Sequence, residues 1–426
     1  MNRSRLLVRP RDGLFLKDGR GWYTSDVGRS HGRSWPLPPT VRGALRAAYG
    51  HTWMAQTREH LRPQAWERAS RALSLRALIA LRIPRDQDPV PAHRLWPCPA
   101  DASYRLLDNP ERTNDLRDLV CSHLPPRIVR LDPKPAHPDV THLEAADARA
   151  DAPMRWSALW RPYVDTGKPA PSPEFWTDDA MMRWLRGDHV DSEPGLSVPR
   201  RTDVHVTLDR VTETATPSML FSTEITEPVE RTGDPEKGHQ FAHWCLALDC
   251  DLPGGTDALP EPSQFPGGPL TIGGRRRLSP VARAPDILFE PPADLGGDSP
   301  GLRVILATPA EFEHGWLPDG FACRGDPPVY VGKLAGIADP VILRAAIVHR
   351  PLDLSTWDMV ERCPRRTRRL VRAGSVYFFH KQNREVFTPD ERRELWLAAL
   401  GRHPEDGLGQ ILPGRWNTRP PNSKDA

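Results

Sequence analysis

Residues 374–380, Gly-Ser-Val-Tyr-Phe-Phe-His (GSVYFFH), carry the strongest strand signal in this chain of 426 residues. β-Branched and aromatic side chains pack well on a pleated surface, so such a run favours a strand. Residues 75–83, within LSLRALIALRI, predict a buried strand that Pro84 closes. Further strands are expected at residues 3–9, 203–211 (DVHVTLDRV), 219–225, 241–249, 302–307, 329–333 and 341–349. The chain is therefore expected to be rich in strands.

Three short helices are expected between these strands. Pro38 and Pro39 precede Thr40, which can cap a helix whose apolar side chains fall on one face, and Gly50 is placed to end it. Arg42 and Arg46 lie on a different face, where we expect both to be presented to solvent or a ligand. Residues 173–186 predict an amphipathic helix, and residues 388–400 predict another with Thr388 as its N-cap.

The proline content limits the length of these elements. The chain has 48 prolines, about twice the usual share, and each removes a backbone donor. We therefore expect an α+β fold with short strands and long loops. Two domains are predicted: residues 1–198, with an inserted lobe at about 85–153, and residues 199–426, which end in a polar tail.

Composition excludes several classes of protein. There are 58 basic and 55 acidic residues, so the chain as a whole is neither strongly acidic nor strongly basic. No apolar run is long enough for a membrane span, and the first residues lack a secretory signal, so we expect a cytoplasmic protein. Six scattered cysteines do not form a disulfide framework. Arginine greatly outnumbers lysine, which suits phosphate binding but equally follows from codon bias.

Two basic clusters are candidates for binding nucleic acid. Arg275, Arg276 and Arg277 follow Gly273 and Gly274, and glycines let a backbone approach a phosphate chain closely. A second run precedes the GSVYFFH strand and comprises Arg362, Arg365, Arg366, Arg368 and Arg369. Basic side chains beside aromatic ones are typical of single-strand binding. The alternative is a solvated arginine loop beside a core strand.

No motif of an ordinary enzyme is present. The chain lacks a GxSxG elbow, a Walker loop and an HExxH pair. His31, between Arg29 and Arg33, is the one candidate acid/base for metal-free RNA cleavage, although a structural loop histidine is the simpler interpretation. His243, Cys245 and Cys250 alternate as in a strand and include no CxxC pair, so neither a metal nor another cofactor is predicted.

Several stretches together resemble one family of RAMP proteins, the third subunit of the Cmr complex, which is the type III-B CRISPR effector. The matches occur in the family's order from residue 10 to about residue 410. They are PRDGLFLKDGR (10–20), WPLPPTVRGALR (35–46), LWPCPAD (95–101), MLFSTE (219–224), IGGRR (272–276), LATPA (306–310) with GWLP (315–318), RAGSVYFF (372–379) and GLGQ (407–410).

The resemblance implies two ferredoxin-like, RRM-related RAMP modules with inserted loops and hairpins. It also implies a non-catalytic subunit that holds the 5′ repeat-derived handle of the guide RNA (crRNA). Its protein partners would be the large polymerase/cyclase subunit and the backbone RAMP subunits. For RNA binding we predict Lys17, Arg20, Arg42, Arg46, Gly273, Gly274, Arg275, Arg276 and Arg277. The alternatives are a RAMP endoribonuclease that processes precursor crRNA with His31 as acid/base, and a protein-binding cap that touches no RNA.

Overall fold

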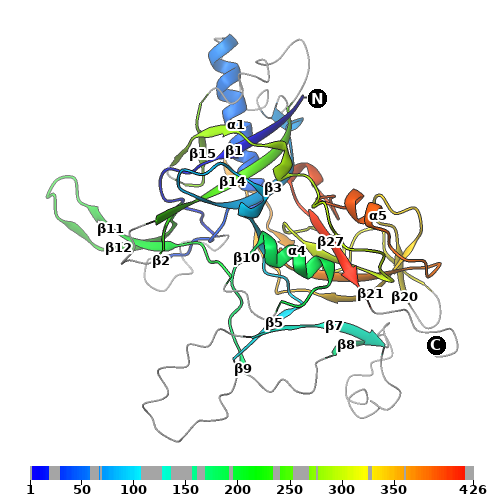
Figure 1. Ribbon diagram of the computed structural model, residues 1–426. Coiled ribbons are helices and arrows are strands. Elements are labelled where there is room, and N and C mark those ends of the chain that lie inside the picture. Colours follow the sequence, from blue (N-terminus) through cyan, green and yellow to red (C-terminus); the bar gives the residue numbers. More distant parts are fainter. Residues whose placement is uncertain are drawn as a thin grey trace, which may run out of the picture.

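Two antiparallel β-sheets form the body of the protein (Figure 1). The computed structural model describes residues 2–18, 29–57, 67, 70–106, 127–135, 156–160, 168–190, 195–233, 240–252, 268–274, 277–324, 329–358 and 361–417. Strands hold 46% of the residues and helices 14%. The α+β prediction is therefore confirmed in its coarse form, a fold made mostly of strands with few helices.

The first sheet has seven strands, and the two longest lie at its centre. Its order is β10 (Phe175–Thr177), β4 (Arg94–Pro97), β3 (Ser74–Pro84), β14 (Gln240–Leu252), β1 (Asn2–Val8) and β17 (Val281–Arg283), with β13 (Val229–Thr232) also beside β14. The strands predicted around 75–83 and 241–249 are β3 and β14, and Ala80 pairs with Leu246 between them. The predicted end at Pro84 is confirmed.

The second sheet has six strands and contains the GSVYFFH stretch. Its order is β19 (Ala322–Arg324), β20 (Val329–Gly332), β21 (Val341–Ile347), β26 (Val376–Lys381), β18 (Gly301–Leu306) and β27 (Ile411–Trp416). All six residues of β26 are buried. Both faces of this strand are therefore covered, which explains why its sequence is aromatic without a polar alternate.

Alternating side chains of the first sheet enter two different cores. Leu6 and Val8 of β1 pack with Val41 of helix α1 (Pro38–Thr57). Leu7 faces the opposite way, into a cluster that contains side chains of helix α4 (Asp178–Arg186) and Phe378 of the second sheet. Helix α1 therefore covers one face of the first sheet, and the other face packs on a core that it shares with α4 and the second sheet.

The sheets do not follow the predicted domain division at 198/199. β13, β14 and β17 come from the second predicted domain yet belong to the first sheet, and the second sheet begins only at Gly301. β4 lies within the predicted lobe at 85–153 and pairs with β3 through Ala80 and Leu95. The strands of the first sheet therefore come from both predicted domains.

Two details predicted for α1 are wrong. The helix begins at Pro38, where the carbonyl of Leu37 accepts the amides of Thr40 and Val41, so Thr40 lies inside it. It continues past Gly50 to Thr57. A glycine inside a helix costs only about 1 kcal/mol, which packing of the apolar face outweighs. That face was predicted correctly, because Val41, Leu45 and Tyr49 are buried.

A hairpin projects from the body as an arm (Figure 1). It consists of β11 (Arg200–Leu208) and β12 (Ala215–Thr226), and β2 (Arg29–Ser30) lies parallel to β12. The smaller sheets are β5 (Ala102–Leu106) with β6 (Arg127–Arg130) and β9 (Lys168–Pro169), β7 (Asp132–Pro135) with β8 (Trp156–Trp160), β15 (Leu270–Ile272) with β16 (Arg277–Ser279), β22 (Leu352–Leu354) with β25 (Arg368–Leu370), and β23 (Trp357–Asp358) with β24 (Cys363–Pro364). The last helix, α5, spans Pro389–Glu394.

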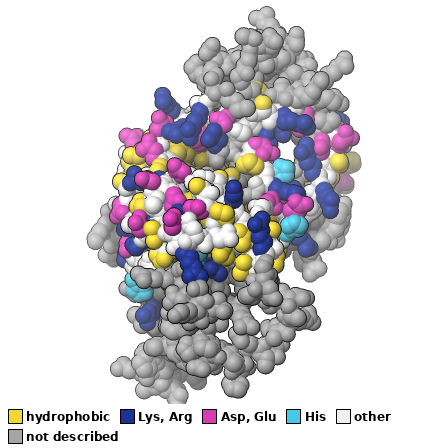
Figure 2. All heavy atoms as spheres, turned by 90° about the vertical axis from the view of Figure 1, so that its right-hand side faces the viewer, with side chains coloured by type: hydrophobic (Ala, Val, Ile, Leu, Met, Phe, Trp, Pro, Cys, Tyr) yellow, Lys and Arg dark blue, Asp and Glu magenta, His cyan; other side chains and the backbone are white. Residues whose placement is uncertain are grey.

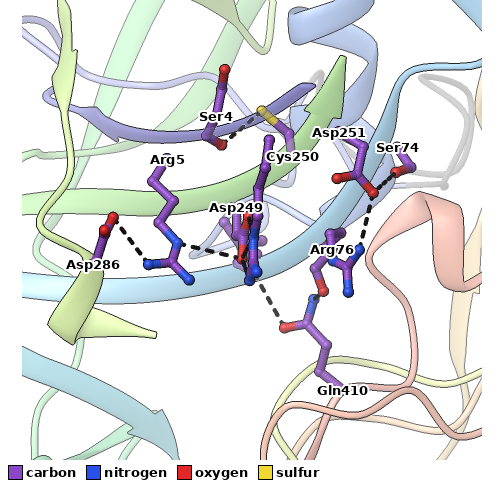
Figure 3. A network of polar contacts seen from close by, with 11 residues as sticks. Ser4, Arg5, Ser74, Arg76, Asp249, Cys250, Asp251, Asp286 and Gln410 are labelled. Carbon is purple, nitrogen blue, oxygen red and sulfur yellow. Dashed lines mark hydrogen bonds and ion pairs between the residues drawn. The ribbon is translucent and has the colours of Figure 1, made fainter. Parts of the chain in front are cut away.

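Gln410 joins the two halves of the molecule. Its side-chain amide accepts a hydrogen bond from the Leu78 amide at 3.2 Å and donates one to the Arg76 carbonyl at 2.8 Å (Figure 3). β4 pairs with β3 only at Ala80 and Leu81, so the glutamine satisfies backbone groups that would otherwise form a free sheet edge. The predicted GLGQ match at 407–410 thus contacts the first sheet.

Candidate functional site

An open cleft of about 1770 Å³ separates α1 from the β22–β25 region. One wall comes from α1 together with residues 15–17 and 271–274, and the other from residues 353–357 and 365–369. Ten Lys and Arg side chains line the cleft, against six acidic ones: Glu67, Glu311, Glu313, Asp353, Glu405 and Asp406. This excess of cations favours an anionic ligand.

The cleft gathers most of the predicted binding residues that the structure describes. Lys17, Arg42, Arg46, Gly273 and Gly274 all line it. Four members of the second basic run also line it, namely Arg365, Arg366, Arg368 and Arg369. Segments that are more than 300 residues apart in the sequence thus meet at one surface.

Three predicted residues lie outside the described residues, and one lies elsewhere. The residues outside the described part of the chain are Arg20, Arg275 and Arg276. Arg277 is described but does not line the cleft, and its guanidinium lies 3.8 Å from the carboxylate of Asp12.

Arg42 and Arg46, predicted to be presented to solvent or a ligand, line the cleft but are not freely exposed to solvent. Arg42 contacts the Asp406 carboxylate at 2.6 Å and also donates to the Leu73 carbonyl at 2.8 Å. Arg46 pairs with Glu67 at 2.7 Å. Their side chains are only 11% and 14% exposed. The carbonyls of Arg71 and Leu73 contact Arg42, and the side chains of Glu67 and Ser70 contact Arg46. Burial lowers the pKa of Arg46, and the neighbouring Glu67 opposes that shift.

Asp406 links the two walls of the cleft. Its carboxylate pairs with Arg42 of α1 and, at 3.5 Å, with Arg368 of β25. Arg368 also lies 3.0 Å from Glu311. The acids therefore hold several of the cleft's guanidiniums in fixed positions before any ligand arrives.

The glycine pair at 273–274 packs against the protein itself. Gly273 has φ +74°, and a Cβ there would lie 2.5 Å from the Phe15 carbonyl oxygen. A Cβ on Gly274 would lie 2.6 Å from the Phe15 ring. The close approach that these glycines were predicted to give a phosphate is thus made, on this side, to Phe15.

Sequence reasoning missed four members of the site. Arg33, Arg71, Arg402 and Trp357 line the cleft and carry no local motif. Arg33 reaches the Asp353 carbonyl across 320 residues of sequence. Within the described ranges, Arg71 and Arg366 have no ion pair, and both are exposed. These two cations are the most available to a ligand.

His31 does not lie in the cleft. Its Nδ1 is 3.6 Å from Glu224, whose other carboxylate oxygen accepts the Gly32 amide. This contact fits a histidine that secures a loop. Among the residues that the structure describes, no group of three or more His, Cys, Asp or Glu is placed to hold a metal ion.

Basic side chains alone do not mark the cleft, since arginine is abundant over the surface. On the face shown in Figure 2, Lys and Arg side chains are interspersed with Asp and Glu. The cleft differs by combining concavity with an excess of cations.

The family model described as "CRISPR-associated protein (Cas_Cmr3)" matches residues 6–416. The chain belongs to this family. The resemblance found in the sequence is thereby confirmed, and membership of Cas_Cmr3 supports a role in the Cmr complex. No curated protein matches the chain.

Solved structures of type III CRISPR complexes are distantly similar to this Cas_Cmr3 chain. A chain of the type III-B Cmr-beta bound to cognate target RNA and AMPPnP has a TM-score of 0.39 and 10% identity, covering 88% of this chain and 86% of that one. A chain of the Cmr-beta complex with target RNA has a TM-score of 0.38 and 10% identity, covering 89% and 86%. A chain from the Csm3–Csm4 subcomplex of the type III-A interference complex has a TM-score of 0.31 and 8% identity, covering 91% of this chain and 100% of that one. In the described part of the chain, no helix is both long and apolar enough to cross a membrane.

Proposed function

We propose that this protein is the non-catalytic, guide-RNA-binding subunit of a cytoplasmic type III-B CRISPR (Cmr) effector complex that targets RNA. In this role it holds the 5′ repeat-derived handle of the crRNA and docks on the large polymerase/cyclase subunit, next to the backbone RAMP subunits. The observation that carries the proposal is the basic cleft, where three of the stretches that match the family, at 10–20, 35–46 and 272–276, come together.

The cleft suits the backbone of a single strand. Single-stranded RNA is bound through phosphate contacts and through bases splayed into loops. Exposed Arg71 and Arg366 would contact phosphates, while the paired Arg42, Arg46 and Arg368 supply positive charge at fixed positions. Their carboxylate partners lower the net charge, so affinity would depend on where phosphates sit rather than on charge alone.

The non-catalytic part of the proposal is supported by the place of His31. An endoribonuclease needs its acid/base within hydrogen-bonding reach of the RNA. His31 lies outside the cleft and pairs with Glu224. Replacing it by alanine is therefore expected to leave any RNA cleavage by the purified complex unchanged.

The order of elements supports a ferredoxin-like first module. When the other strands between them in the chain are left out, β1, α1, β3, β4, α4 and β14 follow the strand–helix–strand–strand–helix–strand order of that unit. α1 and α4 lie on opposite faces of the sheet, so the proposed module is a rearranged relative of that unit. We propose the second sheet as the other RRM-related module.

The test begins with co-purification of the tagged full chain from its native host, followed by sequencing of bound RNA. Short guides that share one 5′ tag, together with a large polymerase/cyclase subunit, are expected. Recovery of the chain without RNA or partners would overturn the proposal. Recovery of partners with no RNA would favour the protein-binding cap instead.

The second step locates the RNA in the cleft. We would measure how affinity for a labelled guide RNA falls with salt, comparing the full chain with a double variant, Arg71→Gln with Arg366→Gln. Loss of two phosphate contacts should make the log–log salt slope shallower by about 1.4. The matched control is Arg324→Gln, an exposed arginine on β19 outside the cleft. An equal change in the control would refute a cleft-bound RNA.

A further inference from the structure

Trp357 is the most exposed tryptophan side chain that the structure describes. It is 56% exposed, compared with 40% for Trp316, and it lines the cleft between the β22–β25 region and α1. In the described part of the chain it belongs to no apolar cluster and makes no ring contact. A large aromatic surface thus faces a cleft in which Lys and Arg side chains outnumber acidic ones.

Several contacts hold the segment that carries Trp357 in place. Trp357 pairs with Pro364 in the β23–β24 ladder, and the Arg365 amide donates to the Thr356 carbonyl at 2.7 Å. The guanidinium of Arg365 lies 3.1 Å from Asp358, and the Ser355 hydroxyl donates to the Arg365 carbonyl at 2.8 Å. Little conformational freedom is left for this segment to lose on binding.

We infer that Trp357 is a platform on which one unpaired base of the bound RNA stacks. The inference rests on the proposed function and names the part of the RNA that this wall of the cleft recognises. A base has an apolar face that fits an indole ring, and its phosphate carries the charge that neighbouring Arg366 can neutralise. A base in a duplex has both faces covered by its neighbours. Trp357 therefore selects for single-stranded RNA.

A protein partner is the competing occupant of this surface. The charge of the cleft favours RNA, because Arg366 and Arg369 line the same wall as the tryptophan and Arg366 has no ion pair among the described residues. A protein would have to bring acidic groups to this wall, whereas an RNA strand brings a phosphate with each base.

The test compares Trp357→Ala and Trp357→Phe with the wild-type full chain, using a fluorescent single-stranded guide RNA that carries the 5′ tag. Loss of one stacked base should weaken binding by about 5- to 150-fold in the alanine variant. The phenylalanine variant should retain most of the affinity. The salt slope should not change, because stacking releases no counterions, in contrast to the Arg71/Arg366 variant.

Trp316→Ala is the matched control, since Trp316 is also exposed but does not line the cleft. A scan of the RNA with single abasic positions should find one position where the abasic change and Trp357→Ala do not add. This readout does not depend on how well a variant folds.

The possible results separate the inference from the proposed function. If wild-type chain binds no guide RNA, both are wrong. If it binds, and only the arginine variant weakens binding, the stacking inference is wrong while the proposed function stands. If Trp357→Ala lowers retention of a partner subunit but not of RNA, the side chain contacts protein and the inference is overturned.

Discussion

Asp406 joins the two walls of the cleft through its ion pairs. It is 15% exposed and pairs with Arg42 on one wall and Arg368 on the other. Removing its charge leaves two partly buried guanidiniums without this partner. Such a loss lowers stability more than breaking an exposed ion pair does, and less than leaving a fully buried charge without its partner.

We therefore predict that Asp406→Asn lowers the free energy of unfolding by about 1–3 kcal/mol. Urea unfolding at neutral pH measures this. The adjacent Glu405, which pairs only with the exposed His403 among the described residues, provides the control. Glu405→Gln should leave stability nearly unchanged, and equal losses in the two variants would contradict the role given to Asp406.

At this scale the sequence identified cations but not their partners. Lys17, Arg42 and Arg46, which were predicted to bind RNA, line one cleft together with the glycine pair at 273–274. The pairing of Arg42 with Asp406 joins residues 364 positions apart, and no local pattern encodes such a contact. Arg42 and Arg46, which the sequence suggested were available to a ligand, are for this reason found in ion pairs with Asp406 and Glu67.

Helix α5 shows which features of an element the sequence can specify. Thr388 is the N-cap, as predicted, and accepts the Glu391 amide at 3.2 Å while Glu391 accepts the Thr388 amide at 2.9 Å. The helix ends at Glu394 rather than near residue 400 as predicted. Leu397 has φ +57°, and its amide donates to Ile411, so pairing with β27 replaces the helical bonds.

The same cap gives α5 a pH-dependent contribution to stability. Burial alone would raise the pKa of Glu391, but hydrogen bonds from Lys381 and the Thr388 amide, together with the charge of Lys381, lower it overall. A carboxylate with a lowered pKa in the folded state stabilises the protein above its ordinary pKa. That stabilisation disappears as the pH falls through the folded-state value.

We accordingly predict that Glu391→Gln is less stable than wild type at pH 7, and that the difference narrows below about pH 4.3. Glutamine can still cap the helix, so the substitution isolates the charge. Urea unfolding from pH 7 downward follows the difference, with exposed Glu394→Gln as the control. A difference that stays constant over this pH range would show that the charge contributes nothing.

The long central strands were predictable because their residues alone specify them. β3, β14 and β26 carry enough apolar residues to be recognised in isolation. Strands of two residues, such as β23, exist only because a partner segment lies beside them. The place of Trp357 beside the second basic run was for that reason not foreseen.

For the whole molecule, the shared core predicts that neither sheet folds alone. Trp96 and Trp184 from the first part of the chain pack in one cluster with Phe378 and Trp416 from the second. Residues 1–292 and 293–426, produced separately, should each lack a cooperative thermal transition, and co-expression should restore one. Calorimetry measures this, and a cooperative transition in either fragment alone would contradict it.

The sequence could not reveal this organisation because the first sheet is completed late in the chain. β1 pairs with β14, so Asn2 lies opposite Leu252. The succession of expected strands and helices suggested a boundary near residues 195–200, but it does not show which distant strands pair with one another.

The glutamine that spans the two sheets also provides a way to observe them. The Leu78 amide donates to the side chain of Gln410, which belongs to the other half of the molecule. Deuterium exchange of the Leu78 amide is therefore controlled by separation of the two sheets and not by fraying of β3. One backbone proton thus reports how often the two sheets separate.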